Sequence, residues 1–302
     1  MLKSLDQMNE MLRQNPTKSR MGVVAAHDEH TLQAVSAAVR DGLVEPVLYG
    51  FADKTAEIWK AVADGLPMPE IVACDDVQEC VAKAMLAVNQ GQLQCVMKGI
   101  LDTAIIMKGV VNSETGIRAS DTLSSFALLE SPYYHKLFGL TDPGIVIQPT
   151  LQQKVGIINN AVEAMHKLGV ETPKVAVLSA MEHVNPKMPD SVEAAELKKM
   201  NQEGLITGCI VEGPISYDIA MNAEAAQIKG FDSPVAGDAD IVIMPEISAG
   251  NIAVKALMDT GGAISAGTAL GAKVPLVLAS RGSSARDKYL SIVLSALVGP
   301  KA

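Results

Sequence analysis

The stretch VPLVLASRGSSARDKYLS, residues 274–291, joins an apolar run to a segment rich in hydroxyl and charged side chains. The valines and leucines before Ser280 are typical of a strand that is covered on both faces. After it, Ser283 or Ser284 stands shortly before Asp287, which predicts the start of a helix. A strand that leads directly into a helix is the repeating unit of an α/β fold.

The same alternation of short apolar runs and longer amphipathic segments continues along the chain. We expect strands at residues 21–27, 45–50, 70–74, 95–99, 144–149, 174–180, 207–214, 239–245 and 274–280. Repeated strand–helix units predict mostly parallel sheets with right-handed crossovers. This many strands exceeds the usual size of one open sheet, so we expect two α/β lobes. Residues 130–144 are expected to form a crossing or a hairpin between them.

Composition and charge exclude several classes of protein. The 302 residues are 48% apolar and 3% aromatic and carry a formal charge of −9, which indicates a globular protein with an aliphatic core. The acidic balance argues against nucleic acid as a partner. No apolar run is long enough to cross a bilayer, so no membrane association is expected. Cys74, Cys80, Cys95 and Cys209 form no CxxC pair, and we expect buried reduced thiols and a cytoplasmic protein.

Candidate site residues follow the expected strands, because ligands of open α/β sheets bind beyond the carboxyl ends of the strands. Lys98, Lys255, Arg281 and Arg286 are cations in or near such loops and suit an anionic ligand beside helix N-termini. None of the loops contains GxGxxG or the P-loop pattern, so nucleotide binding by those two devices is not expected.

Two of these loops have alternative interpretations. Asp287 is either the first-turn carboxylate of a capped helix or a catalytic group, and Arg281 beside it suits a phosphate that accepts two hydrogen bonds. The HDEH stretch at residues 27–30 suggests metal ligands or a helix cap, and we expect the cap and no metal. No G-x-S-x-G motif accompanies any serine, which argues against a Ser-His-Asp hydrolase.

Six blocks of sequence, in order, resemble the phosphate acetyl/butyryltransferase family over essentially the whole chain. They are MKGILDT (97–103), TGIRASDTLSSFALLE (115–130), VGIINNAVEAMHKLGV (155–170), KMNQEGLITGCIVEGPISYD (199–218), GDADIVIMPEISAGNIAVKAL (237–257) and VPLVLASRGSSARD (274–287). The chain length and KMNQEGLITGCIVEGP look closer to the butyryl branch. GPISYD and Asp287 are instead similar to the acetyl branch.

The resemblance implies the reaction acyl-CoA + phosphate ⇌ acyl phosphate + CoA, with butyryl or another short or branched chain, or alternatively acetyl. Coenzyme A and phosphate are substrates, and no metal or redox cofactor is implied. The implied fold is two-lobed and similar to the isocitrate/isopropylmalate dehydrogenase-like fold. Residues 1–129 with 268–302 are expected to form the lobe that carries the Ser-Arg motif, and residues 130–267 the other. The active site is expected in the cleft between them, and the assembly is expected to be a homodimer.

Individual roles follow from the same resemblance. Ser280 and Arg281 fall on the Ser-Arg motif of the family, and Asp287 falls on its downstream Asp. This implies that Asp287 is the general base for the CoA thiol, that Ser280 donates a hydrogen bond and that Arg281 clamps phosphate. Substrate-binding roles are expected for Arg118, Lys98, Asn251, Lys255 and Arg286. Arg118 has a surface salt bridge as its alternative.

Two other classes of protein compete with this interpretation. A catalytically silent protein that binds CoA or phosphate would keep the fold, but the intact Ser280-Arg281-Asp287 set argues against silence. A dehydrogenase that uses NAD and a divalent metal would need a cluster of aspartates to hold the metal, and none stands out in the sequence.

Overall fold

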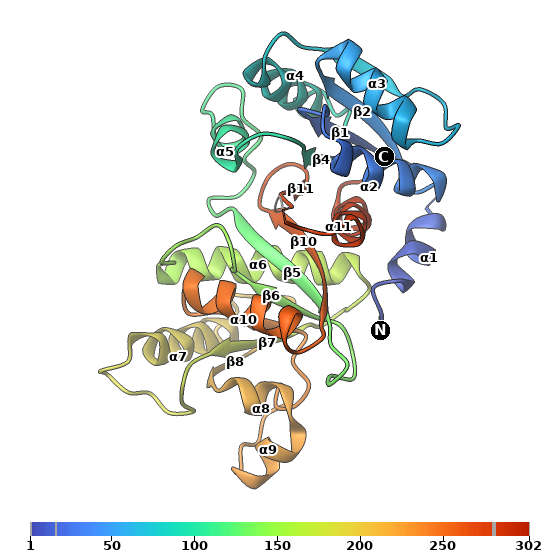
Figure 1. The fold of residues 1–302 in the computed structure, drawn as a ribbon. Coiled ribbons are helices and arrows are strands. Elements are labelled where there is room, and N and C mark those ends of the chain that lie inside the picture. Colours follow the sequence, from blue (N-terminus) through green and yellow to red (C-terminus); the bar gives the residue numbers. More distant parts are fainter. Residues whose placement is uncertain (1, 16, 280–281, 302) are drawn as a thin grey trace. The chain divides into compact units, whose positions relative to one another are not determined.

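The chain divides into two compact α/β units. The structure, a computed structural model, describes residues 2–15, 17–279 and 282–301. Unit 1 consists of Met1–Ser4 and Asp121–Ser265, and unit 2 of Leu5–Ser120 and Ala266–Ala302 (Figure 1). The chain thus changes unit at 4/5, 120/121 and 265/266. The sequence predicted boundaries at 129/130 and 267/268 and none near the N-terminus. No helix in the described part of the chain has the length and apolar content needed to span a bilayer.

Unit 2 is built on a mostly parallel sheet. Its strands are β1 (Ser19–Val24), β2 (Val44–Gly50), β3 (Glu70–Ala73), β4 (Cys95–Lys98), β11 (Leu276–Val277) and, from residue 266 on, β10 (Ile264–Leu270). They lie in the order β3-β2-β1-β4-β11-β10, and β10 is antiparallel to β11 while the other pairs are parallel. The chain therefore adds β2 and β3 on one side of β1 and then returns to place β4 on the other side.

Helices cover the sheet of unit 2. They are α1 (Gln7–Arg13), α2 (Glu29–Arg40), α3 (Ala52–Val62), α4 (Val77–Asn89), α5 (Thr103–Val110) and α11 (Ala285–Val298). α2 packs against α3 and α11, and α4 packs against β1, β2 and α5. Leu290, Val293 and Leu294 of α11 follow helical spacing and are 0 to 1% exposed. Most residues of α11 are buried, so this helix is part of the core of unit 2.

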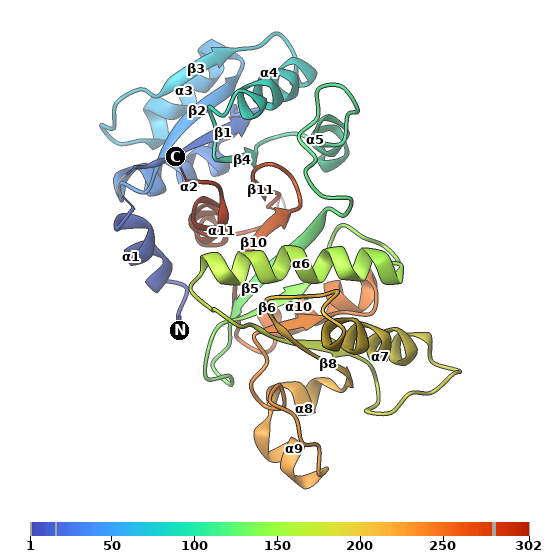
Figure 2. The ribbon, with the colours of Figure 1, turned by 180° about the vertical axis from the view of Figure 1, so that it is seen from behind.

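Unit 1 holds a second, separate α/β core. Its strands β5 (Ser124–Glu130), β6 (Phe138–Thr141), β9 (Ile241–Ile243), β7 (Lys174–Leu178) and β8 (Ile210–Ile215) lie in the order β5-β6-β9-β7-β8. β5 and β6 are antiparallel, and the remaining pairs are parallel. Its helices are α6 (Leu151–Lys167), α7 (Pro189–Gln202), α8 (Tyr217–Met221), α9 (Ala223–Ile228) and α10 (Ile247–Asp259). α10 lies on the face of the sheet turned to the viewer in Figure 1, and α6 on the face seen in Figure 2.

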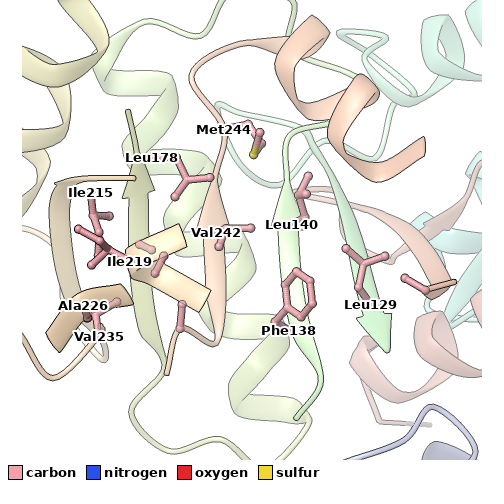
Figure 3. Packing of buried hydrophobic residues seen from close by; sticks show 14 residues of the cluster. Leu129, Phe138, Leu140, Leu178, Ile215, Ile219, Ala226, Val235, Val242 and Met244 are labelled. Atoms are coloured by element: carbon pink, nitrogen blue, oxygen red, sulfur yellow. The ribbon is translucent and has the colours of Figure 1, made fainter. Parts of the chain in front are cut away.

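Apolar side chains fill the core of unit 1 between the sheet and α8, α9 and α10. Phe138 and Leu140 of β6 and Val242 of β9 are fully buried against Ile219 of α8 (Figure 3). Packing on the opposite side of β6 leaves no room at Gly139, because a Cβ there would lie 2.2 Å from the ring of Phe126. A phenylalanine ring thus occupies the space that any other residue at position 139 would need.

The strand predicted at residues 144–149 is wrong. These residues form a loop, because the Asp142 carboxylate accepts hydrogen bonds from the backbone N–H groups of Gly144 (2.7 Å), Ile145 (2.9 Å) and Val146 (3.0 Å). The segment 130–144, expected as a crossing or a hairpin, supplies the turn and second strand of the β5–β6 hairpin. β5 and β10 were not expected as strands.

A cluster of charged side chains lies at the start of β6, β7 and β9. The Lys136 ammonium group lies 2.7 Å from Asp240 and 2.8 Å from Asp238, and the side chains of Lys136 and Asp240 are 1% and 2% exposed. Lys174 and His135 also bind the Asp238 carboxylate. Burial alone would raise the pKa of Asp238, but the hydrogen bonds from Lys136, Lys174 and His135 outweigh it and hold that pKa well below its usual range.

The lowered pKa predicts acid sensitivity through this cluster. A carboxylate with a depressed pKa stabilises the fold at a pH above its unfolded value of about 3.9, and this contribution is lost as the pH falls through the folded value. We expect the thermal midpoint to fall as the pH drops below about 4. Asp238→Asn should lower the midpoint at neutral pH and flatten its acid dependence. Glu196→Gln, on exposed α7 surface, is the control; a wild-type acid slope in Asp238→Asn would contradict the assignment.

Candidate active site

A pocket of about 310 Å³ opens in unit 2 where the strand order reverses. It is lined by Asp28, His30, Thr31, Lys98, Gly99, Ile100, Ala279 and Lys288. Lys98 is the last residue of β4, and the others follow the carboxyl ends of β1, β4 and β11 or belong to the first turns of α2 and α11. Because β2 and β4 lie on opposite sides of β1, the loops after β1 and β4 diverge at this point. Such a switch point is where ligands of open parallel sheets bind.

The turn after β4 is packed directly on β1. The Gly99 N–H donates to the Val24 carbonyl at 2.8 Å and the Ile100 N–H donates to the Ala25 carbonyl at 3.1 Å. A Cβ on Gly99 would lie 2.3 Å from the Ala25 oxygen, so only glycine fits here. Ala25 itself has φ of 56°, a left-handed conformation that is unfavourable for alanine. This strained junction forms the wall between the β1 and β4 ends of the pocket.

Lys98, predicted as a substrate-binding residue, lines this pocket as the last residue of β4. It is only 7% exposed. Its ammonium group donates to the Leu101 carbonyl at 3.0 Å and to the Gly99 carbonyl at 3.4 Å. These two hydrogen bonds hold the ammonium group of Lys98 at the pocket wall.

Within the HDEH stretch, Asp28 is the residue that caps a helix. The Asp28 carboxylate accepts a hydrogen bond from the Thr31 N–H at 2.9 Å, as the N-cap of α2. His27 is stacked on Phe51 with ring centroids 4.2 Å apart, and its burial lowers its pKa. Within the residues that the structure describes, no group of three or more His, Cys, Asp or Glu side chains is arranged to hold a metal.

The N-terminus of α11 carries the predicted general base. Ser284 and Asp287 form a capping box, in which the Asp287 N–H donates to Ser284 Oγ at 3.1 Å and the Ser284 N–H donates to Asp287 Oδ2 at 3.0 Å. The predicted helix-cap role of Asp287 is therefore present in the structure. Ser280 and Arg281 lie outside the described residues, between the pocket residue Ala279 and this cap.

The other predicted binding residues do not line this pocket in the described structure. Arg286 is exposed and lies 3.5 Å from Asp6, and Arg118 is an exposed residue whose backbone bridges to Ala272. Asn251 and Lys255 belong to α10 of unit 1, where the Asn251 amide donates to the Pro143 carbonyl at 3.2 Å. The structure thus brings together Lys98 and the start of α11 among the predicted site residues.

Sequence reasoning did not identify Lys288. It directly follows Asp287, is 6% exposed and lines the pocket. A lysine in the first turn of a helix is unexpected, because that end of the helix carries partial positive charge. That anomaly was the available signal, but burial of the side chain is a tertiary property that the spacing does not reveal.

The four cysteines are free thiols and lie outside the pocket lining. Burial raises the pKa of Cys74 and Cys95 to about 12 and that of Cys209 to about 11, and it also raises the pKa of Cys80. Thiolates are the nucleophilic form of cysteine, so none of these side chains is suited to attack a substrate at neutral pH.

Comparison with known proteins places this architecture in one class. Residues 64–296 match the family described as phosphate acetyl/butaryl transferase. A phosphate acetyltransferase of Thermotoga maritima is 43% identical, over 97% of this chain and 99% of that protein. A phosphate butyryltransferase of Clostridium acetobutylicum is 38% identical, over 99% of each chain. The crystal structure of a branched-chain phosphotransacylase from Enterococcus faecalis is 32% identical, with a TM-score of 0.82, and covers 93% of this chain and 98% of that one.

The class that these matches define is that of the phosphate acyltransferases. This chain belongs to the phosphate acetyl/butaryl transferase family, as its six sequence blocks predicted.

Proposed function

We propose that the protein catalyses acyl-CoA + phosphate ⇌ acyl phosphate + CoA with butyryl or another short or branched acyl chain. The observation that carries the proposal is the pocket at the β1–β4 switch point, where Lys98 supplies a fixed cation and Ala279 leads directly into the Ser280-Arg281 pair. The butyryl and branched-chain relatives support the choice of acyl group. Acetyl transfer is the second candidate, because the acetyltransferase of Thermotoga maritima is also similar over the full length.

The chemistry proposed for the start of α11 assigns one task to each residue. Asp287 accepts the proton of the CoA thiol, and the thiolate attacks the carbonyl carbon of the acyl phosphate. The C–S bond forms, the bond from that carbon to the phosphate oxygen breaks, and phosphate leaves. Ser280 donates a hydrogen bond to the sulfur or to the oxyanion, and Arg281 binds the departing phosphate. The Ser284 N–H orients the Asp287 carboxylate for its task.

Arg118, Asn251, Lys255 and Arg286 keep their predicted substrate-binding roles as proposals. Coenzyme A and phosphate are substrates, and the reaction as proposed uses no metal or redox cofactor. We place the two α/β units in the isocitrate/isopropylmalate dehydrogenase-like fold. A cytoplasmic location is supported by the four free cysteines, which suit a reducing compartment.

The reaction itself is tested by following thiol release from acetyl-, butyryl- and isobutyryl-CoA, each with and without phosphate. We expect phosphate-dependent release, fastest with butyryl- or isobutyryl-CoA, because the proposed chemistry transfers the acyl group to phosphate. The fastest substrate identifies the acyl group. Release that ignores phosphate would indicate a thioesterase, and binding of CoA without any release would indicate a catalytically silent protein.

The role of Asp287 is tested by comparison with its capping partner. Asp287→Asn should lower turnover by roughly two or more orders of magnitude, because the amide cannot accept the thiol proton. The fold should persist, since the Asn side-chain oxygen still accepts the Ser284 N–H. Ser284→Ala is the matched control; it should cost about 0.5–2 kcal/mol of stability but change turnover far less. If turnover is unchanged in Asp287→Asn, Asp287 has only the helix-capping role.

The assembly is proposed to be a homodimer. Within α10, Gly250 is the buried residue, while Ile252 is 67% exposed, so this helix leaves apolar surface uncovered by its own unit. Light scattering should give twice the 31.7 kDa mass of one chain. Ile252→Glu should shift the mass toward one chain if a second copy covers α10, and Lys255→Glu, on exposed α10 surface that already carries charge, is the comparison. A wild-type mass of one chain would contradict the dimer.

A further inference from the structure

We propose that Lys288, with Lys98, forms an anion site that holds a phosphate group of one of the substrates. The inference deepens the proposed function and rests on it for the identity of the ligand. It adds a residue that neither the sequence blocks nor the Ser280-Arg281-Asp287 assignment contains.

Among the described residues, Lys288 is a buried cation that no carboxylate pairs. Its side chain belongs to a residue that is only 6% exposed, and it lines the pocket. No hydrogen bond or ion pair joins its ammonium group to any of residues 2–15, 17–279 or 282–301. A buried charge is costly unless it is paired, and the pocket is the route by which an anion reaches this one.

The position of Lys288 in its helix strengthens the attraction for an anion. α11 begins at Ala285 after the N-cap Ser284, so Lys288 stands in the first turn, at the positive end of the helix dipole. Asp287 in the same turn offsets part of this charge and accepts the Ser284 N–H. Lys98 adds a second buried cation from the end of β4. Two lysine side chains, one of them from the first turn of α11, therefore line one pocket.

The remaining described lining residues cancel only part of this charge. Asp28 is the one carboxylate among the described lining residues. It accepts hydrogen bonds from the neutral N–H and hydroxyl of Thr31, which leave its negative charge in place, so it offsets one of the two lysine charges and leaves the other for a ligand. His30 is exposed at the rim. The volume of about 310 Å³ is at the small end of the range for ligand pockets, so it suits one charged group and not a whole coenzyme.

A phosphate group can reach this site from two sources in the proposed reaction. One is orthophosphate or the phosphoryl end of the acyl phosphate, and the other is a phosphate of coenzyme A. The pocket residue Ala279 directly precedes Ser280, which the proposed mechanism places at the reacting carbonyl. That adjacency in the sequence favours orthophosphate and acyl phosphate as the source.

The test measures binding without turnover, by calorimetric titration of orthophosphate, CoA and 3′-dephospho-CoA. Three variants are compared with the wild type: Lys288→Met, which removes the charge, Lys288→Arg, which keeps it, and Lys60→Met, an exposed lysine of α3 in the same unit. Lys288→Gln replaces the Met variant if that one does not fold. Melting temperatures without ligand are recorded for each protein.

We expect the orthophosphate Kd of Lys288→Met to rise roughly tenfold or more, with Lys288→Arg close to the wild type and Lys60→Met unchanged. A loss confined to CoA would identify its 3′-phosphate as the ligand, and a loss shared by CoA and dephospho-CoA would identify its pyrophosphate; both support the anion site. Without ligand, Lys288→Met should melt no lower than the wild type, because an unpaired buried charge is gone.

Unchanged affinity for all three ligands would overturn the proposal, and a lower melting temperature with unchanged affinities would assign Lys288 a structural role only. These outcomes are separate from those of the acyl-transfer assay. If Lys288→Met binds all three ligands normally and transfers acyl groups at the full rate, the anion site is disproved and the proposed function stands. Orthophosphate binding that depends on Lys288 stands even if no acyl transfer is detected.

Discussion

The close contact between the turn after β4 and the end of β1 is the constraint on which the candidate site depends. Gly99 approaches the Ala25 carbonyl so closely that a side chain cannot be added, and Ala25 accepts a left-handed conformation there. Strain of this kind persists only where the surrounding structure imposes it. Here the imposing structure is the parallel pairing of β1 with β4 on one side and with β2 on the other. The divergence of the chain at this junction creates the pocket and fixes Lys98 in its wall.

The start of α11 shows how one residue can have a structural and a chemical role. Asp287 and Ser284 satisfy each other's backbone N–H groups, so the helix has a defined first residue without any ligand. The carboxylate is thereby held at a fixed place next to a pocket residue, which is what a general base requires. The cap and the proposed catalysis therefore do not exclude each other. The helix cap supplies the rigidity that the proposed proton transfer uses.

The sequence predicted the elements whose signal is local. The runs at residues 45–50, 95–99 and 174–180 correspond to β2, β4 and β7, because a strand buried on both faces must be apolar throughout. Residues 144–149 are equally apolar, but the Asp142 side chain takes up three of their backbone N–H groups, and that competition is decided by local geometry. β10 contains Gly267 and small residues, so its strand character comes from pairing with β11. Within the site, Lys98 could be predicted from its place after an apolar run, whereas the burial of Lys288 results from the packing of α11.

Two buried lysines show how partners distinguish a structural charge from a functional one. Lys136 in unit 1 and Lys288 in unit 2 are both nearly inaccessible, at 2% and 6% exposure. Lys136 forms ion pairs with Asp238 and Asp240, so its charge is neutralised within the fold. Lys288 has no such partner in the described chain and lies against open volume instead of a carboxylate. Lys136 therefore receives its compensation from the fold, whereas no carboxylate of the described residues compensates Lys288, and an anion bound in the pocket would supply that compensation.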